Sequence, residues 1–378
     1  MRSQFLLFTF LVFFTGLFLG ILRIVIPVLE REQGLSAEIS ILIPLVVFGF
    51  IKGIFNFLTG KLSDILGRKK LQMAGWVVAL LASLILMIWI DPLIVILVTC
   101  LLAINQALTW TTSVTSQIDI SGKRRAGLAT GINEMSGYLG VALGNFLASQ
   151  VYGMSIFIIL GTSLVALFVS LGVMETKTLI SDPPKRESYR KITPISVIGL
   201  VEKFVDSSFF VVIPTYLLIK GFSLGYVGDL TAVYTLTWSL SQPLFGYLAD
   251  SFSRVKVVIS GLILMSIGFI DFLLSPQFFS FIEGLGMGMI YPNLIALVND
   301  KVGEGSRGKA LGYYRLYRDS GYGAAGLLLP LLYIKFGFSD TLLLVGLLQV
   351  IFIPFLFDKN QGKPMSITKS PRRESHSS

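Results

Sequence analysis

The sequence predicts an all-α membrane protein, built from twelve transmembrane helices arranged as two pseudo-symmetric bundles of six. Three observations support this fold class. The chain of 378 residues is 53% hydrophobic and 14% charged, whereas soluble domains carry about 25% charged residues. Its apolar runs are about as long as the ~20 residues that cross a bilayer. In addition, residues in the first half recur in the second.

The twelve spans follow from the apolar runs, which alternate with short polar segments. The first run begins after Arg2 and passes Arg23 and Pro27 without a small-residue cleavage site, so we expect a retained helix rather than a signal peptide. The expected spans are residues 5–29, 37–60, 71–90, 93–117, 125–149, 154–174, 194–218, 225–248, 255–275, 278–298, 308–332 and 339–357.

A polar segment that contains Pro183-Pro184 separates six spans from six. The expected organisation is therefore an N-terminal six-helix bundle at 1–174, a linker at 175–193 and a C-terminal six-helix bundle at 194–358. Residues 359–378 are rich in Lys, Arg and Ser, and such a composition is typical of a disordered tail.

The loop charges predict the orientation of the chain, because cytoplasmic loops carry an excess of Lys and Arg. One side holds most of them, together with the basic linker and tail, whereas the other shows only Arg31, Lys220 and Lys335. We therefore expect a multi-pass protein of the plasma membrane with both termini in the cytoplasm. An even number of spans agrees with this orientation.

The two halves share residues at a nearly constant shift. Gly60, Asp64, Arg68 and Lys70 recur 186 positions later as Gly246, Asp250, Arg254 and Lys256, and Asp119 and Arg125 correspond to Asp300 and Arg307. Such a repeat in the same orientation predicts two bundles related by an axis along the membrane normal.

Residues 60–70 read G-K-L-S-D-I-L-G-R-K-K and resemble the signature loop between helices 2 and 3 of the major facilitator superfamily. The second copy at 246–256 is degenerate, since Ser253 stands where the first copy has its second glycine. The resemblance covers essentially the whole chain. It implies a secondary active transporter that works by alternating access, and not an enzyme.

The resemblance also implies that the loop latches the two halves at the cytoplasmic face. Asp64 would then cap helix 11 near Arg307, and Asp250 would cap helix 5 near Arg125. The alternative is that these charges act only as topology signals. The expected latch residues are Gly60, Asp64, Gly67, Arg68, Arg125, Gly246, Asp250, Arg254 and Arg307.

Charged and polar residues within the spans are the candidates for chemistry, because a charge at bilayer depth costs about 2.5–3.5 kcal/mol on insertion scales. The resemblance implies a central cavity lined by helices 1, 4, 7 and 10, where many of these residues fall. The candidates for substrate binding or coupling are Arg23, Asn105, Gln106, Trp110, Glu134, Glu202, Asp206, Glu283, Tyr291, Arg315, Arg318 and Asp319.

Several of these residues have a structural alternative. Arg315 and Asp319 are spaced i, i+4 and are able to pair within one helix. We hypothesise that Asp206 or Glu134 carries a proton, the alternative being a structural ion pair. The Thr- and Ser-rich run of helix 4 either binds substrate or bonds to its own carbonyls.

The expected function is proton-coupled transport of a small solute, and the intramembrane arginines favour an anionic or acidic one. The alternatives are a multidrug efflux antiporter and, less favoured, a non-transporting membrane sensor. Residues 137–145 lack the helix 5 proline of the superfamily's drug antiporters, which disfavours the first alternative. The other expected partners are the lipid bilayer and protons. We expect a monomer without cofactors, and no nucleic-acid partner because the basic residues lie in short clusters between apolar spans. We expect no metal site, because Cys100 and His376 are the sole cysteine and histidine.

Overall fold

The computed structural model describes residues 1–34, 37–88, 90–179 and 189–357. The predicted tail at 359–378 and part of the predicted linker lie outside this range. The longer helices are α1 (Arg2–Glu32), α2 (Ala37–Leu66), α3 (Arg68–Ile88), α4 (Pro92–Ser121), α5 (Ala126–Gln150), α6 (Ser155–Leu171), α7 (Thr193–Ile219), α8 (Leu224–Ser251), α9 (Arg254–Ile270), α10 (Pro276–Asp300) and α11 (Arg307–Ile351).

The last of these elements holds two of the predicted spans. Gly337 has φ +76° within α11, a left-handed conformation that glycine adopts without the steric cost of a Cβ. The kink separates residues 307–336 from 338–351, close to the predicted spans 308–332 and 339–357. The described residues therefore contain the twelve long helices that the sequence predicts.

Hydropathy alone does not identify every span. Seven stretches of the described chain are long and apolar enough to cross a membrane, and one of them contains both α11 segments. The helices that fall short are α5, α7, α8 and α9. Among these, α7 carries Glu202, Lys203 and Asp206, and α9 has only 17 residues.

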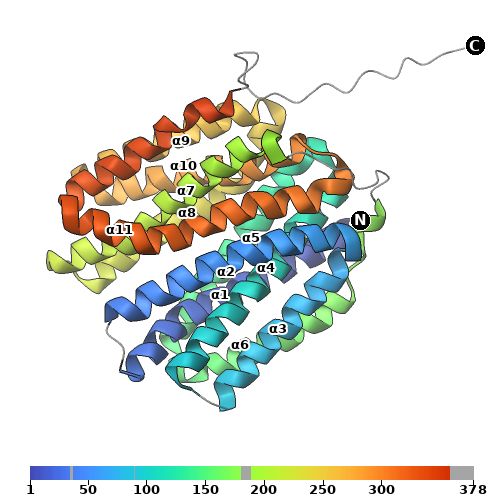
Figure 1. Cartoon of the computed structure of the whole chain (residues 1–378), viewed down its shortest axis with the longest axis horizontal. Helices are drawn as coiled ribbons and strands as arrows, with labels where there is room; N and C mark the ends of the chain where they lie inside the picture. The colour runs from blue at the N-terminus through green and yellow to red at the C-terminus, as the bar shows by residue number, and fades with distance from the viewer. Residues whose placement is uncertain (35–36, 89, 180–188, 358–378) are drawn as a thin grey trace, which may run out of the picture.

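The helices run side by side and form two halves, which Figure 1 shows as a lower blue-to-green group and an upper yellow-to-red group. In the first half, α1 packs on α4, α5 and α6, and α3 packs on α4 and α6. In the second half, α10 packs on α8 and α9, and α7 packs on α11. The halves meet where α2 contacts α11 and where α5 contacts α8.

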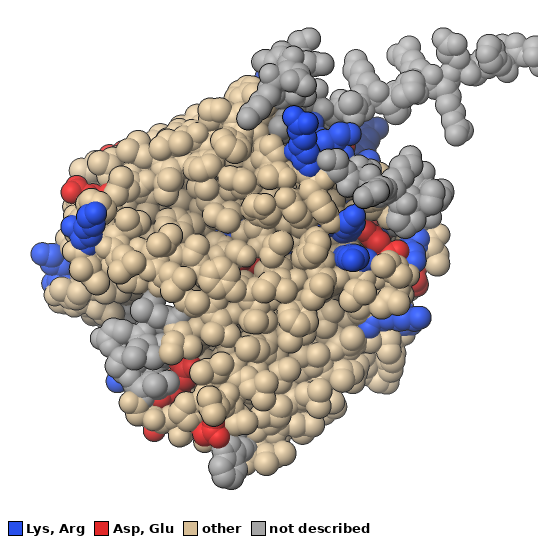
Figure 2. All heavy atoms as spheres, in the orientation of Figure 1, with Lys and Arg blue, Asp and Glu red and all other residues tan. Residues whose placement is uncertain are grey.

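The outer surface suits lipid. Large apolar side chains such as Leu93 and Phe168 are more than three-quarters exposed, and Figure 2 shows a broad face almost free of charge between two charged ends. A soluble monomer rarely exposes so extended an apolar surface. The chain is an integral, multi-pass membrane protein.

Candidate functional site

We call the end of the molecule that carries residues 60–70 and 246–256 the basic end. Here the Asp64 carboxylate at the end of α2 accepts from the backbone N–H groups of Gly308 at 3.1 Å and Lys309 at 2.7 Å. These N–H groups belong to the first turn of α11, where the helix dipole favours a negative charge. A Cβ on Gly60 would overlap the Gly308 carbonyl and crowd Gly312, so the close approach of the two helices requires glycine.

The second copy makes the same contact in the opposite sense. The Asp250 carboxylate of α8 accepts from the N–H groups of Gly127 and Leu128, both at 2.9 Å, at the start of α5. A Cβ on Gly246 would overlap the Gly127 carbonyl. Arg125 is exposed at the N-cap of α5 and forms no ion pair with Asp250 among the described residues.

Two arginines of the repeated loops form ion pairs with buried carboxylates, and the two ion pairs occupy equivalent positions in the two halves. Arg68 pairs with Asp119 at 3.1 Å, and Arg254 pairs with Asp300. Asp119 also pairs with Arg307, and this ion pair joins the first half to the second. The sequence analysis did not place Asp119 or Asp300 in the latch, although both belong to the repeat and thus carried a signal.

Gly67 and Ser253 begin the following helices differently, which explains why the second copy tolerates a serine. Gly67 has φ +98°, and the carboxylate of Glu175 accepts from the N–H groups of Arg68 and Lys69 at 2.9 and 3.1 Å. Ser253 instead caps α9 with its own hydroxyl. The α3 cap is therefore supplied by the segment between the halves.

Midway along the helices, two ion pairs join the halves. Arg315 of α11 contacts Glu134 of α5 at 2.9 Å, and Lys52 of α2 lies 3.7 Å from Asp319 of α11. Trp110 donates its indole N–H to Glu134 at 2.8 Å. Arg315 and Asp319, whose spacing allows a pair inside one helix, form no ion pair with each other among the described residues. Arg315 contacts Glu134, and Asp319 lies near Lys52 and Arg318.

Three further ion pairs lie within the second half, one of them between Arg318 and its neighbour Asp319 at 3.3 Å. Arg318 donates two hydrogen bonds, of 2.9 and 3.1 Å, to the Glu202 carboxylate, and Lys203 contacts Asp206 at 2.6 Å. Tyr234 donates its hydroxyl to Asp206. These residues are at most 2% exposed. Each of the two like charges on α7 therefore has its own cation, which offsets their mutual repulsion.

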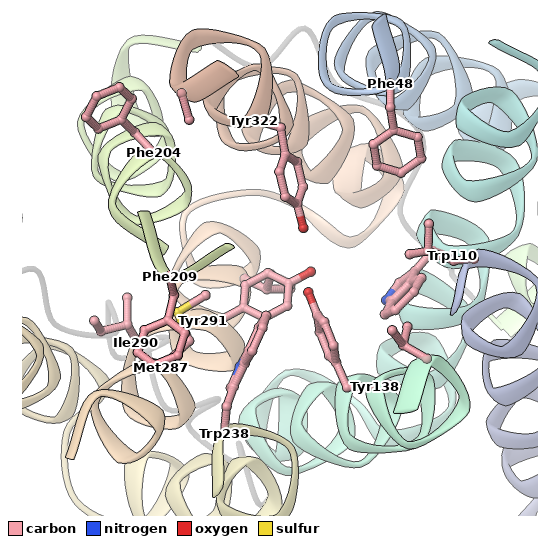
Figure 3. Close-up of a cluster of buried hydrophobic side chains, with 14 of the residues drawn as sticks. Phe48, Trp110, Tyr138, Phe204, Phe209, Trp238, Met287, Ile290, Tyr291 and Tyr322 are labelled. Atoms are coloured by element: carbon pink, nitrogen blue, oxygen red, sulfur yellow. The ribbon is translucent and has the colours of Figure 1, made fainter. Parts of the chain in front are cut away.

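Aromatic rings surround these cations. The Arg318 guanidinium lies 3.5 Å from the Tyr291 ring centre, and the Lys203 ammonium lies 4.6 Å from the Tyr322 ring centre. Figure 3 shows the hydroxyls of Tyr138, Tyr291 and Tyr322 pointing toward one another between the halves. The rings stabilise the cations beside them. We call Tyr138, Tyr291 and Tyr322, whose hydroxyls are able to accept or donate hydrogen bonds, the central tyrosine group.

Arg23 and Glu283 have no ion-pair partner among the described residues. Arg23 of α1 is half-buried, its guanidinium donates to the Tyr322 hydroxyl at 3.5 Å and lies 5.7 Å from the centre of the Phe210 ring. Glu283 of α10 is fully buried, and both of its carboxyl oxygens lack a hydrogen bond. They are the two predicted candidates whose charge the described residues do not neutralise.

The polar side chains of α4 are mostly used within the first half. Asn105 donates to the Gly75 carbonyl and Gln106 to the Thr15 carbonyl, both at 2.9 Å. Thr115 bonds back to the carbonyl one turn earlier. These contacts favour the structural alternative for this helix. The site is instead formed largely by α2, α5, α7 and α11, and not only by the helices that the resemblance implied.

Some site residues escaped the sequence analysis. Asn56 joins Asp319 to Thr111 through hydrogen bonds of 2.5 and 2.6 Å, but a lone Asn in an apolar run carried little signal. Tyr234 and Trp238 looked like ordinary apolar-helix aromatics. Within the described ranges, no group of three His, Cys, Asp or Glu side chains is placed to hold a metal ion.

Comparison with known proteins agrees with this architecture. The profile of the Major Facilitator Superfamily matches residues 8–198 and again residues 195–376. A segment of 152 residues is 26% identical to Multidrug resistance protein 2 of Bacillus subtilis (strain 168), and this match covers 38% of each chain.

Two solved structures share the fold. The human organic anion transporter MFSD10 (TETRAN) superposes with a TM-score of 0.84 at 14% identity, over 94% of this chain and 99% of the other. The E. coli fucose:proton symporter FucP superposes with a TM-score of 0.73 at 11% identity, over 93% and 97%.

Proposed function

The chain belongs to the major facilitator superfamily, whose members are membrane transporters and not enzymes, and from this premise we propose that it moves a small organic anion together with protons. The observation that carries the proposal is the pair of buried ion pairs between the halves, Glu134–Arg315 and Lys52–Asp319. Two halves that rock against each other must break these contacts in each cycle.

The basic end faces the cytoplasm in this proposal, as the Lys and Arg distribution favours. The Asp64 and Asp250 caps then hold the cytoplasmic end closed in the described state. Opening toward the cytoplasm requires both carboxylates to leave the helix N-termini of the opposite half. The loops therefore act as a latch, whose release is one step of alternating access.

A substrate anion and a proton together lower the free-energy cost of separating the two halves. Breaking a buried ion pair by withdrawing one partner costs about 3–5 kcal/mol, because a charge is left without compensation. An anionic substrate replaces Glu134 as the partner of Arg315, and a proton taken up by the central region compensates the added negative charge. The same exchange applies to Asp319 and Lys52.

The composition of the site supports an anion rather than a cation as the cargo. Arg23 is a half-buried cation that has no carboxylate partner among the described residues, and it contacts Tyr322 of the central tyrosine group. One relative of the same fold is named an organic anion transporter. A second candidate function is multidrug efflux, which the 26% identical segment of Multidrug resistance protein 2 favours.

A matched panel of ligands tests the proposal. We expect acetate, succinate or benzoate to raise the melting temperature of the purified protein, whereas acetamide, succinamide and benzamide leave it unchanged. The binding anion should then accumulate in proteoliposomes under an imposed pH gradient. Equal shifts for anions and amides would reject the anion site, and shifts given only by hydrophobic cations such as ethidium would favour efflux of drugs.

A further inference from the structure

Glu283 differs from every other carboxylate of the central region. Glu134, Glu202, Asp206 and Asp319 each lie within 3.7 Å of a Lys or Arg. Glu283 is equally buried, at 0% exposure, but neither carboxyl oxygen has a hydrogen-bond partner within the described part of the chain. A buried carboxyl without a cation therefore stands beside four that have one.

An ionised carboxylate in such a place is strongly unfavourable, because it has lost its water and gained neither a counter-charge nor donors. Glu283 lies seven residues into α10, or about 10 Å along the helix axis, so its side chain is below the membrane surface. The neutral carboxylic acid avoids the cost of burying a charge. The geometry thus favours a carboxyl that holds a proton in this state.

The groups around Glu283 reinforce this preference. From α9, Gly268 packs directly on its side chain. Two ionisable groups on the neighbouring helices interact electrostatically with the Glu283 carboxyl, Asp206 of α7 and Tyr234 of α8. Asp206 repels a negative charge on Glu283, and Tyr234 is already a donor to Asp206. No neighbouring helix contributes a cation to this carboxyl among the described residues.

We propose that Glu283, rather than any of the four ion-paired carboxylates, holds the coupling proton in the described state. The inference rests on the proposed function, since it names the residue that binds the proton moved with the anion. Protonation forms one O–H bond on the Glu283 carboxylate, and the same proton is released to water on the other side of the membrane. One proton therefore crosses for each cycle of this group.

Lys203 connects this proton to the central tyrosine group. Its ammonium contacts Asp206 and also lies over the rings of Trp238 and Tyr322. When Glu283 loses its proton, the negative charge near Asp206 rises and draws Lys203 away from the Tyr322 ring. Proton binding and substrate binding thus act on one side chain, and the coupling between them is reciprocal.

Infrared spectroscopy tests the protonation without a substrate. In a Glu30→Gln background, the protein in nanodiscs at pH 7 should show the C=O stretch of a neutral carboxylic acid, and adding Glu283→Gln should remove that band. Glu202→Gln, which alters an ion-paired carboxylate, should leave the band in place. Glu30→Gln separates the contribution of Glu30, which is also buried without a partner. An unchanged band in Glu283→Gln overturns the proposal.

Transport tests the coupling role. Glu283→Gln should lower accumulation driven by a pH gradient about tenfold or more while exchange of labelled for unlabelled anion persists, since only the proton-dependent step is lost. Glu283→Asp should restore part of the accumulation. If Glu283→Gln accumulates as well as the wild type, Glu283 is not the coupling site. If the wild type moves none of the three panel anions, the transport proposal fails, and the infrared result still decides whether Glu283 is protonated.

Discussion

Substitution of Asp64 by alanine should shift the protein from the closed to the open state at the basic end. The change removes two hydrogen bonds from the N–H groups of Gly308 and Lys309 to a charged acceptor. At about 1.5 kcal/mol each, the low end for bonds to charged groups, the loss is about 3 kcal/mol. This corresponds to about a 150-fold change in the ratio of closed to open molecules.

Electron–electron distance measurements detect this shift. Spin labels at Lys70 and Lys256, which are exposed on opposite halves of the basic end, should report one short distance in a Cys100→Ser background. Asp64→Ala should add a longer component. Asp229→Asn serves as the control, because Asp229 is an exposed carboxylate of α8 outside the latch. Identical distance distributions for Asp64→Ala and the control would refute the latch.

Two further substitutions test the packing and the charges between the halves. Gly60→Ala should destabilise the protein by about 1–3 kcal/mol through overpacking against α11, whereas Gly161→Ala, which meets open space, should be nearly neutral; equal melting temperatures would contradict the close contact. Glu134→Gln should cost about 3–5 kcal/mol because Arg315 stays buried without its partner. Adding Arg315→Met should recover most of this loss in thermal unfolding, and additive effects would argue against a direct pair.

The helix caps of Asp64 and Asp250 were the contacts that the sequence predicted best, whereas their role as a latch stays a prediction. The two carboxylates accept from backbone N–H groups at helix ends, and helix ends are marked in the sequence by loop residues and charge. The repeat even aligned Arg68 and Asp119 with Arg254 and Asp300, but the chain order gave no reason to pair an arginine with an aspartate about 50 positions away. The contact between Arg68 and Asp119 depends on how α3 packs on α4.

The central charges were predicted as a set and not as pairs. Polarity within an apolar run identifies a costly residue, so Glu134, Arg315 and Asp319 stood out at once. Their partners depend on how far each helix is rotated about its axis and on which half faces it. Spacing along α11 allowed Arg315 to meet Asp319, but α5 and α2 bring Glu134 and Lys52 closer.

By itself, the sequence determined that the chain lies in a lipid bilayer, the number of its helices, the repeat of one half in the other and the position of the basic end. Hydropathy, charge and repeat spacing can all be read along the chain. Only the tertiary structure decided which cation meets which carboxylate, and that Glu283 meets none. Those outcomes depend on contacts between helices, where glycines such as Gly60 and Gly246 set the approach of the two halves. Such distances arise from packing over the whole bundle, which no local pattern encodes.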